Sequence, residues 1–331
     1  MKSIEIIKKA TKYSDIFNND EKVAKHEYRE YCKLYHPDTN NSREAQEVFS
    51  IITQLYNNKH CNNVRGTVDE DIEFINIKTS KGFVLSNPVI IKTGISMIYH
   101  TATKIAIVYH KSYKDFFDNY IKNIKNLQYK DANMQSEFKR YFPTILNSFE
   151  MKDDRLCILL DKTPDVLNLG KIVEAYKKQG ELFPEKHAAW ILNRLYNIVC
   201  YINYYNKAFN GLNLENIWIS PEMHSVLILG GWEYTVKQGE KMIGCPKDVY
   251  KILPLKIKDT KQSNITTDLE CIKEIGRILY KGHTNLEHIN KFLNYGIKEG
   301  NPTTEWNEYG KAIDKQFGKR KFIIWDNVPY N

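Results

Sequence analysis

Apolar residues along the chain repeat with two different periods, and these periods predict where helices and strands lie. Residues 21–35 and 43–57 carry apolar side chains at three- and four-residue spacings, which predicts two amphipathic helices. Beyond residue 163 the helical period returns, most clearly over 185–206, and a charged helical region is predicted at 113–140. Runs rich in Ile, Val and Tyr, bounded by turn residues, predict strands at 74–79, 89–100, 104–111, 144–151 and 155–162. This order of elements indicates an α+β, multidomain protein.

The two N-terminal helices are predicted to form a hairpin. Asn19 or Asp20 can cap the start of the first helix, and Ser42 can cap the second. Pro37 must end the first helix, because proline disfavours the helical conformation in the residue before it. Two amphipathic helices joined by so short a loop pack with their apolar stripes against each other.

Composition and charge narrow the classes of protein that remain. The chain has 331 residues and a net charge of +8, which suits nucleic acid or acidic protein surfaces, although a lysine-rich solvated surface is the favoured interpretation. The six cysteines form no CxxC pair, so neither a zinc site nor a disulfide framework is predicted. No apolar run reaches the length of about 18 residues typical of a membrane span, and the N-terminus lacks a signal-peptide pattern. We therefore expect a reduced, cytoplasmic protein without a metal, cofactor or membrane partner.

The loop between the first two helices carries a tripeptide of interest, His36-Pro37-Asp38. With its flanking helices it resembles a J domain, the DnaJ-type module that docks on DnaK-class chaperones and stimulates their ATP hydrolysis. The resemblance covers about residues 5–60. The residues that carry it, besides the tripeptide, are Tyr28, Arg29, Tyr35, Phe49, Ile52 and Tyr56. The alternative is a helix hairpin with an incidental tripeptide in its turn.

The resemblance implies a docking role for particular residues. His36, Pro37 and Asp38 would form the displayed loop, whose proline stiffens it and whose carboxylate meets a cation on the chaperone. Lys25, Arg29 and Lys33 on the first helix would steer it toward an acidic patch on the chaperone. The chain departs from the family at Tyr31, where leucine is usual, and no Gly/Phe-rich segment follows.

The rest of the chain has a second resemblance, carried by three segments. They read FNGLNLENIWIS (209–220), HSVLILGGWEY (224–234) and TDLECIKEIGRILYKG (267–282). In order and phasing they resemble the catalytic loop, the strand before the metal-binding triplet, and the central helix of a protein kinase, with Asp268 as a buried anchor. The alternative is an unrelated α+β domain. The two resemblances together imply a J domain at 1–60, a linker at 61–71, a small β-rich lobe at 72–165 and a large α-rich lobe at 166–331.

The positions that carry kinase chemistry are degenerate. The resemblance places the catalytic base on Gly211, the metal-binding aspartate on Gly230 and the phosphate-binding lysine on Val108. Phosphoryl transfer needs a base, a lysine and metal-binding carboxylates, so this pattern indicates a pseudokinase and not an enzyme. The remaining family positions are Glu137 for the glutamate that partners the lysine, Asn213 for the loop lysine and Asn216 for the metal-binding asparagine.

Two of these residues allow more than one interpretation. Asn216 is expected to hydrogen-bond the backbone of its own loop, with metal binding as the alternative. Trp232, after Gly230 and Gly231, is expected either to plug the vacated nucleotide cleft or to lie in the core.

These observations lead to the hypothesis of a co-chaperone-like adaptor. Its J domain would recruit a DnaK-class chaperone, and its pseudokinase domain would bind an unidentified protein target. The arrangement is similar to J-domain fusion proteins of large tailed phages, which implies the host cytoplasm as the location. The alternatives are an atypical kinase-fold transferase that uses Glu215 and Asn216, and a basic nucleic-acid-associated protein, which is not favoured.

Overall fold

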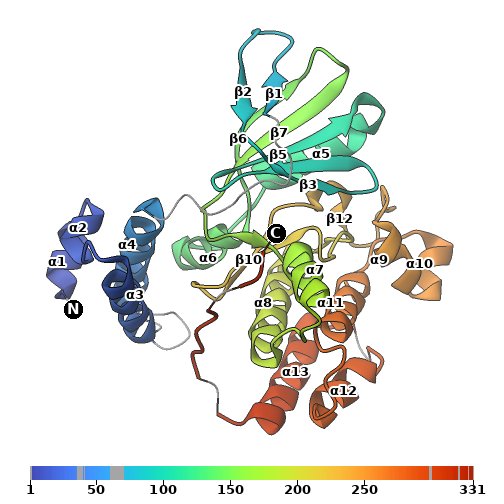
Figure 1. Ribbon diagram of the computed structural model, residues 1–331. Helices are drawn as coiled ribbons and strands as arrows, with labels where there is room; N and C mark the ends of the chain where they lie inside the picture. Colours follow the sequence, from blue (N-terminus) through green and yellow to red (C-terminus); the bar gives the residue numbers. More distant parts are fainter. Residues whose placement is uncertain are drawn as a thin grey trace.

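The computed structural model describes residues 2–35, 40, 42–59, 71–297, 300–319, 321–326 and 328–330. The predicted linker 61–71 therefore lies outside the described residues except for Asp71. A group of N-terminal helices stands beside a larger body, which has a small β-rich lobe above a large helical lobe (Figure 1).

The N-terminal helices pack around their own small core. The two long helices of the predicted hairpin are present and lie side by side (Figure 1). Asp20 accepts hydrogen bonds from the backbone at the start of the first of them, and Ser42 caps the second. Tyr28 stacks on Tyr56 across the pair, with ring centroids 4.0 Å apart. The helices are α1 (Ile4–Lys9), α2 (Tyr13–Ile16), α3 (Glu21–Tyr35) and α4 (Arg43–Lys59).

The small lobe is an antiparallel sheet with a helix packed on one face. The sheet order is β3-β4-β5-β7-β6, and a separate hairpin of β1 and β2 lies at its top (Figure 1). The predicted strand at 89–100 is two strands, because the Thr93 hydroxyl bonds Ser96 and turns the chain there. The strands are β1 (Ile72–Ile75), β2 (Gly82–Leu85), β3 (Val89–Lys92), β4 (Ser96–His100), β5 (Lys104–His110), β6 (Thr144–Glu150) and β7 (Arg155–Asp161).

The charged region predicted at 113–140 forms two helices with different neighbours. Helix α5 (Lys114–Lys125) packs on β5 and β7, whereas α6 (Ala132–Phe138) comes after a break at residues 126–131. The residue Asp131 caps α6 by accepting a hydrogen bond from Met134. This break matters for the site, because of these two helices it is α5 that contacts β5, the central strand of the sheet.

The large lobe is built around one long buried helix, α8 (Glu185–Tyr204), as the sequence predicts. It packs between α11 and α13, and its apolar residues join a core that continues up to the lower face of the sheet. Within the described residues, no helix is both long and apolar enough to cross a membrane. The other helices are α7 (Leu169–Gln179), α9 (Lys247–Ile252), α10 (Leu255–Thr260), α11 (Thr266–Leu279), α12 (Glu287–Asn294) and α13 (Pro302–Phe317).

Short strands line the boundary between the two lobes. Strands β11, β10 and β8 form one small sheet, and β12 pairs with β9. After α13 the chain runs back between the N-terminal helices and the large lobe and ends near β10 (Figure 1). The strands are β8 (Leu167–Asn168), β9 (Lys207–Ala208), β10 (Ile217–Ser220), β11 (Ser225–Ile228) and β12 (Val236–Lys237).

Candidate functional site

The loop that resembles a kinase catalytic loop is tied to α11 by one buried carboxylate. Asp268 is fully buried and accepts hydrogen bonds from the backbone N–H of Phe209 at 2.6 Å and of Asn210 at 2.8 Å. Burial raises the pKa of Asp268 to about 7, while the two backbone donors act in the opposite direction. Asp268 is therefore the anchor of this loop, as expected from the sequence.

Gly211 and Gly230, where the resemblance to a kinase leads us to expect carboxylates, are closely packed by neighbouring groups. A Cβ atom built on Gly230 would lie 2.4 Å from Oδ1 of Asn216, and one on Gly211 would lie 2.8 Å from the carbonyl oxygen of Gly231. Both distances are too short for an ordinary contact, so side chains at these positions require their neighbours to move. The packing around Gly211 and Gly230 thus leaves no space for a side chain unless these neighbours move.

Asn216 supports this arrangement with its side-chain amide. Its Nδ2 donates to the carbonyl oxygen of Gly211 at 2.8 Å, and its backbone N–H donates to Oδ1 of Asn213 at 3.1 Å. Asn213 in turn donates to Asp248 at 3.3 Å. The amide of Asn216 closes the loop on itself, which is the structural interpretation of this residue.

Trp232 lies in the core and does not line the pocket between the lobes. Its indole N–H donates to the carbonyl oxygen of Ile228 at 2.8 Å, and its ring meets Phe142 and Phe209 edge-to-face, with centroids 5.3 and 5.1 Å away. Gly231 precedes it with a φ of +83°, which turns the chain so that the indole points inward. The interpretation of Trp232 as a plug of an open cleft is wrong, because its buried neighbours hold it in the core.

Val108 and Glu137 do not face each other as a lysine–glutamate pair would. Along β5, Ile105, Ile107 and Tyr109 join the main core, whereas Val108 belongs to a separate cluster beneath the β1–β2 hairpin. Glu137 lies on α6 and accepts a hydrogen bond from Asn197 of α8 at 3.5 Å. The sequence assignment of both residues is thus corrected, since successive strand residues face opposite sides and α5 is the helix on β5.

Helix α5 instead meets the chain after β11 through polar groups that the sequence did not single out. Tyr120 donates to the carbonyl oxygen of Leu229 at 2.6 Å, and Asn123 donates to that of Trp232 at 3.1 Å. Glu233 is buried beside Tyr109, and burial raises the pKa of its carboxyl to about 7. In the sequence, these contacts are indicated only by polar residues within the apolar stripe of α5 and by the glutamate that follows Trp232.

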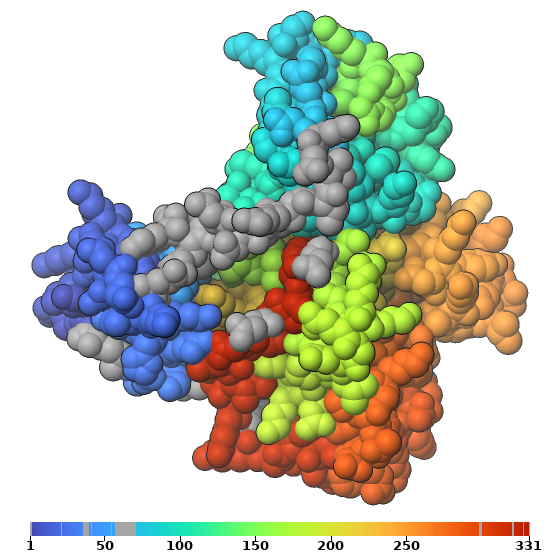
Figure 2. Space-filling view, viewed as in Figure 1, coloured from blue at the N-terminus to red at the C-terminus, as the bar shows by residue number. Residues whose placement is uncertain are grey.

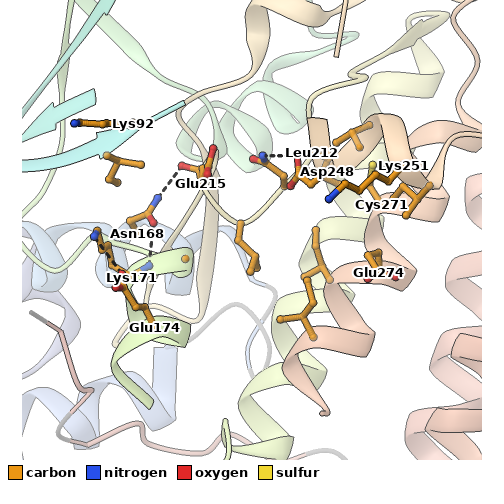
Figure 3. Close-up of a pocket in the computed structure, with 18 of the residues that line it drawn as sticks. Lys92, Asn168, Lys171, Glu174, Leu212, Glu215, Asp248, Lys251, Cys271 and Glu274 are labelled. Carbon is orange, nitrogen blue, oxygen red and sulfur yellow. Dashed lines mark hydrogen bonds and ion pairs between the residues drawn. The ribbon is translucent and has the colours of Figure 1, made fainter. Parts of the chain in front are cut away.

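A pocket of about 660 Å³ opens at the boundary of the two lobes. Figure 3 shows Glu215 between Asn168 of β8 and Lys171 of α7 on one side and Asp248 of α9 on the other. Burial and the neighbouring Asp248 raise the pKa of Glu215. The pocket is lined by Ile90, Ile91, Lys92, Asn168, Gly170, Lys171, Glu174, Leu212, Asn213, Leu214, Glu215, Asp248, Val249, Lys251, Ile252, Cys271, Glu274, Ile275 and Ile278.

The charges in this pocket decide which groups it can hold. Lys171 pairs with Glu174 at 3.2 Å, and Glu274 pairs with Arg277 at 2.7 Å, so these charges are compensated locally. Of the other charged residues in the lining, Glu215 and Asp248 lie beside this loop, and Lys92 and Lys251 add two cations, so the pocket presents charges of both signs. Among the described residues, no group of three or more His, Cys, Asp or Glu side chains is placed to hold a metal ion.

The basic face of α3 is in contact with the end of the chain. The Arg29 guanidinium and the Lys25 ammonium, the latter at 3.9 Å, both pair with the carboxylate of Asp326, while Lys33 pairs with Glu30 at 2.5 Å on its own helix. The predicted docking loop, His36-Pro37-Asp38, lies outside the described residues.

Comparison with solved structures shows what kind of fold carries this site. The crystal structure of the BubR1 kinase domain superimposes with a TM-score of 0.51 at 10% identity, covering 80% of this chain and 91% of that one. A rhoptry kinase from Toxoplasma gondii gives a TM-score of 0.47 at 12% identity, covering 80% and 92%. No family model matches the chain, and no curated protein matches its sequence. The chain therefore has a protein-kinase-like fold, and at these identities the likeness concerns the fold alone.

Proposed function

We propose that the protein is a non-catalytic adaptor: its N-terminal helices act as a J domain that recruits a DnaK-class chaperone, and its pseudokinase body binds a target protein. The observation that carries the non-catalytic part is the glycine packing at the two carboxylate positions. Gly211 and Gly230 lie against the backbone and against Asn216, so neither a base nor a metal-binding aspartate has room there.

The second support for this proposal is that the inner face of β5 carries no lysine. The face of β5 that looks toward α5 and the large lobe carries Ile105, Ile107 and Tyr109, none of which can compensate a phosphate. The pocket nearby presents Glu215 and Asp248 together with Lys92 and Lys251. A boundary with apolar residues on β5 and charges of both signs in the pocket suits a protein segment better than the phosphates of a nucleotide.

The J-domain part of the proposal is supported by the pairing of α3 with α4 around the tripeptide sequence. Tyr28 and Tyr56 hold the two helices together by stacking, and the cations Lys25, Arg29 and Lys33 follow one another along α3 at four-residue spacings. A row of cations beside a short loop is the arrangement that would steer the loop to an acidic surface.

The test is stimulation of a DnaK-class chaperone's ATP hydrolysis in single-turnover assays. We expect the wild-type protein to accelerate hydrolysis and the His36→Gln variant to lose this effect while keeping the wild-type melting temperature. His288→Gln, the same exchange at an exposed position of α12, is the matched control and should behave as wild type.

The outcomes separate the proposed function from its rivals. Equal stimulation by wild type and His36→Gln would contradict the docking role of the loop. Magnesium-dependent labelling of a substrate from ATP, lost on Glu215→Gln, would favour the transferase alternative, for which the raised pKa of Glu215 in the pocket is the supporting observation.

A further inference from the structure

The last residues of the chain form a strap across the molecule. We define the C-terminal strap as residues 321–326 and 328–330, which follow α13. In Figure 2 these residues lie in the hollow between the N-terminal helices and the large lobe, and they end at the lobe boundary. The strap therefore touches each of the three parts of the structure.

Aromatic side chains anchor the strap on the body. Trp325 is 7% exposed, donates to the Tyr176 hydroxyl at 3.1 Å and stacks on His187 with centroids 4.3 Å apart. At the far end the Tyr330 hydroxyl lies 3.1 Å from Nε2 of His100 in the small lobe. Burial of large aromatic rings is strongly favourable, so these contacts fix the path of the strap.

Between these anchors the strap meets α3. Asp326 directs its carboxylate at Arg29 and Lys25, two of the three cations in the proposed chaperone-docking face. Phe322 packs against the core of the N-terminal helices and stacks on His224 of the large lobe, 4.3 Å away. The strap therefore holds α3 with its basic face turned toward the body.

A second carboxylate from the body lies near the same cations. Glu222, in the turn between β10 and β11, is partly buried; burial and the nearby Asp165 raise the pKa of its carboxyl to about 7, while Lys25 and Arg29 lower it. The adjacent Met223 receives a hydrogen bond from the Tyr28 hydroxyl at 3.7 Å. The contact between α3 and the body thus already places carboxyl groups near the cations of α3, as an acidic chaperone surface would have to do.

An exposed ion pair is weak when its partners meet freely in solution. Here the aromatic anchors hold Asp326 beside Arg29, which raises its effective concentration there far above that of a separate molecule. A partner carboxylate must displace Asp326 before it can pair with Arg29 and Lys25. The apparent affinity of that partner therefore equals its intrinsic affinity multiplied by the fraction of molecules in which the strap is released.

We propose that the C-terminal strap is an autoinhibitory latch: Asp326 occupies the Lys25–Arg29 face of α3 and competes there with the acidic surface of a DnaK-class chaperone. This inference rests on the proposed function, and it adds that docking requires release of α3 from the strap. It also assigns a role to Asp326, which lies in no motif of the sequence.

The latch is tested first without any chaperone. Carbodiimide coupling joins an ammonium and a carboxylate only when they are in contact, and mass spectrometry identifies the linked peptides. We expect a Lys25–Asp326 link in the full-length wild type and none in Asp326→Asn. Absence of the link in the wild type would overturn the latch whatever the chaperone assays show.

The second measurement is competition with the chaperone. We expect ATP-loaded DnaK-class chaperone to suppress the Lys25–Asp326 link, and Asp326→Asn to lower the half-saturating chaperone concentration about two- to fivefold, the range for an exposed ion pair. Asp259→Asn, which removes the same charge from an exposed position on α10, should match wild type.

Persistence of the link at saturating chaperone, or equal half-saturation for Asp326→Asn and Asp259→Asn, would overturn the latch while leaving His36-dependent stimulation intact. If the link forms but no variant shows His36-dependent stimulation, the proposed function fails, and competition with a chaperone fails with it.

Discussion

At the scale of single residues, glycine and asparagine determine the character of the site. Gly231 adopts a φ of +83°, and a Cβ atom on it would lie 2.8 Å from the ring of Phe209 and 2.9 Å from the carbonyl oxygen of Gly211. Asn216 fills the adjoining space with its amide. These close contacts mean that adding back a kinase-like side chain disturbs the loop instead of completing a catalytic centre.

We predict that Gly231→Ala lowers the free energy of unfolding by about 2–4 kcal/mol. The left-handed backbone penalises a Cβ, and the methyl group collides with fixed neighbours, so the two costs add. Gly94→Ala is the matched control, because nothing lies within 4 Å of its Cβ position and its φ is not in the left-handed region. Urea denaturation measures both variants. A change below 1 kcal/mol for Gly231→Ala would mean that the loop adapts easily.

At the scale of secondary-structure elements, different helices hold different parts of the site. Helix α5 lies on the sheet and holds the chain after β11 through Tyr120 and Asn123, while α6 carries Glu137 to α8. Helix α11 holds the loop before β10 through Asp268. Helix α3 presents cations along its length, of which Lys33 pairs with Glu30 of its own helix.

We predict that Lys33→Ala weakens chaperone docking about two- to threefold at low salt, and that the loss shrinks at high salt. Exposed charges act mainly on the association rate, and they are screened within about 10 Å at 0.1 M salt. Lys9→Ala removes the same charge from an exposed position of α1 and serves as the control. The measurement is the association rate of each variant and of the wild type with the chaperone, at salt concentrations from about 0.05 to about 0.5 M. A loss independent of salt would show that the alkyl stem of Lys33 contributes by packing.

At the scale of the whole molecule, one continuous core joins the large lobe to the lower face of the sheet, and the N-terminal helices have a core of their own. Phe322 of the strap packs against the second core while Trp325 belongs to the first. The strap thus connects two units that fold around separate cores. The boundary between the lobes holds a pocket whose lining carries charges of both signs.

We predict that millimolar ATP with magnesium leaves the melting temperature of the protein unchanged. A nucleotide bound at 100 times its dissociation constant would stabilise the native state by about 2.7 kcal/mol, a shift of about 4 °C for a chain of this size. An ATP-binding kinase melted in the same buffers shows that the assay detects binding. A rise that requires magnesium would contradict the pseudokinase interpretation and favour the transferase.

The sequence by itself determined the elements whose signals are local. Residue types and spacing predict the caps Asp20 and Ser42 and the buried stripe of α8, and the structure contains all three. Only the tertiary structure decided which face of β5 packs into the body. Successive side chains of a strand point to opposite faces of the sheet, and this alternation does not tell which of the two faces is buried in the main core. The tertiary structure also decided that α5, and not the helix with Glu137, lies on the sheet. The pairing of Asp326 with Arg29 joins residues 297 positions apart, and no local pattern predicts a contact that depends on how separate cores are arranged in space.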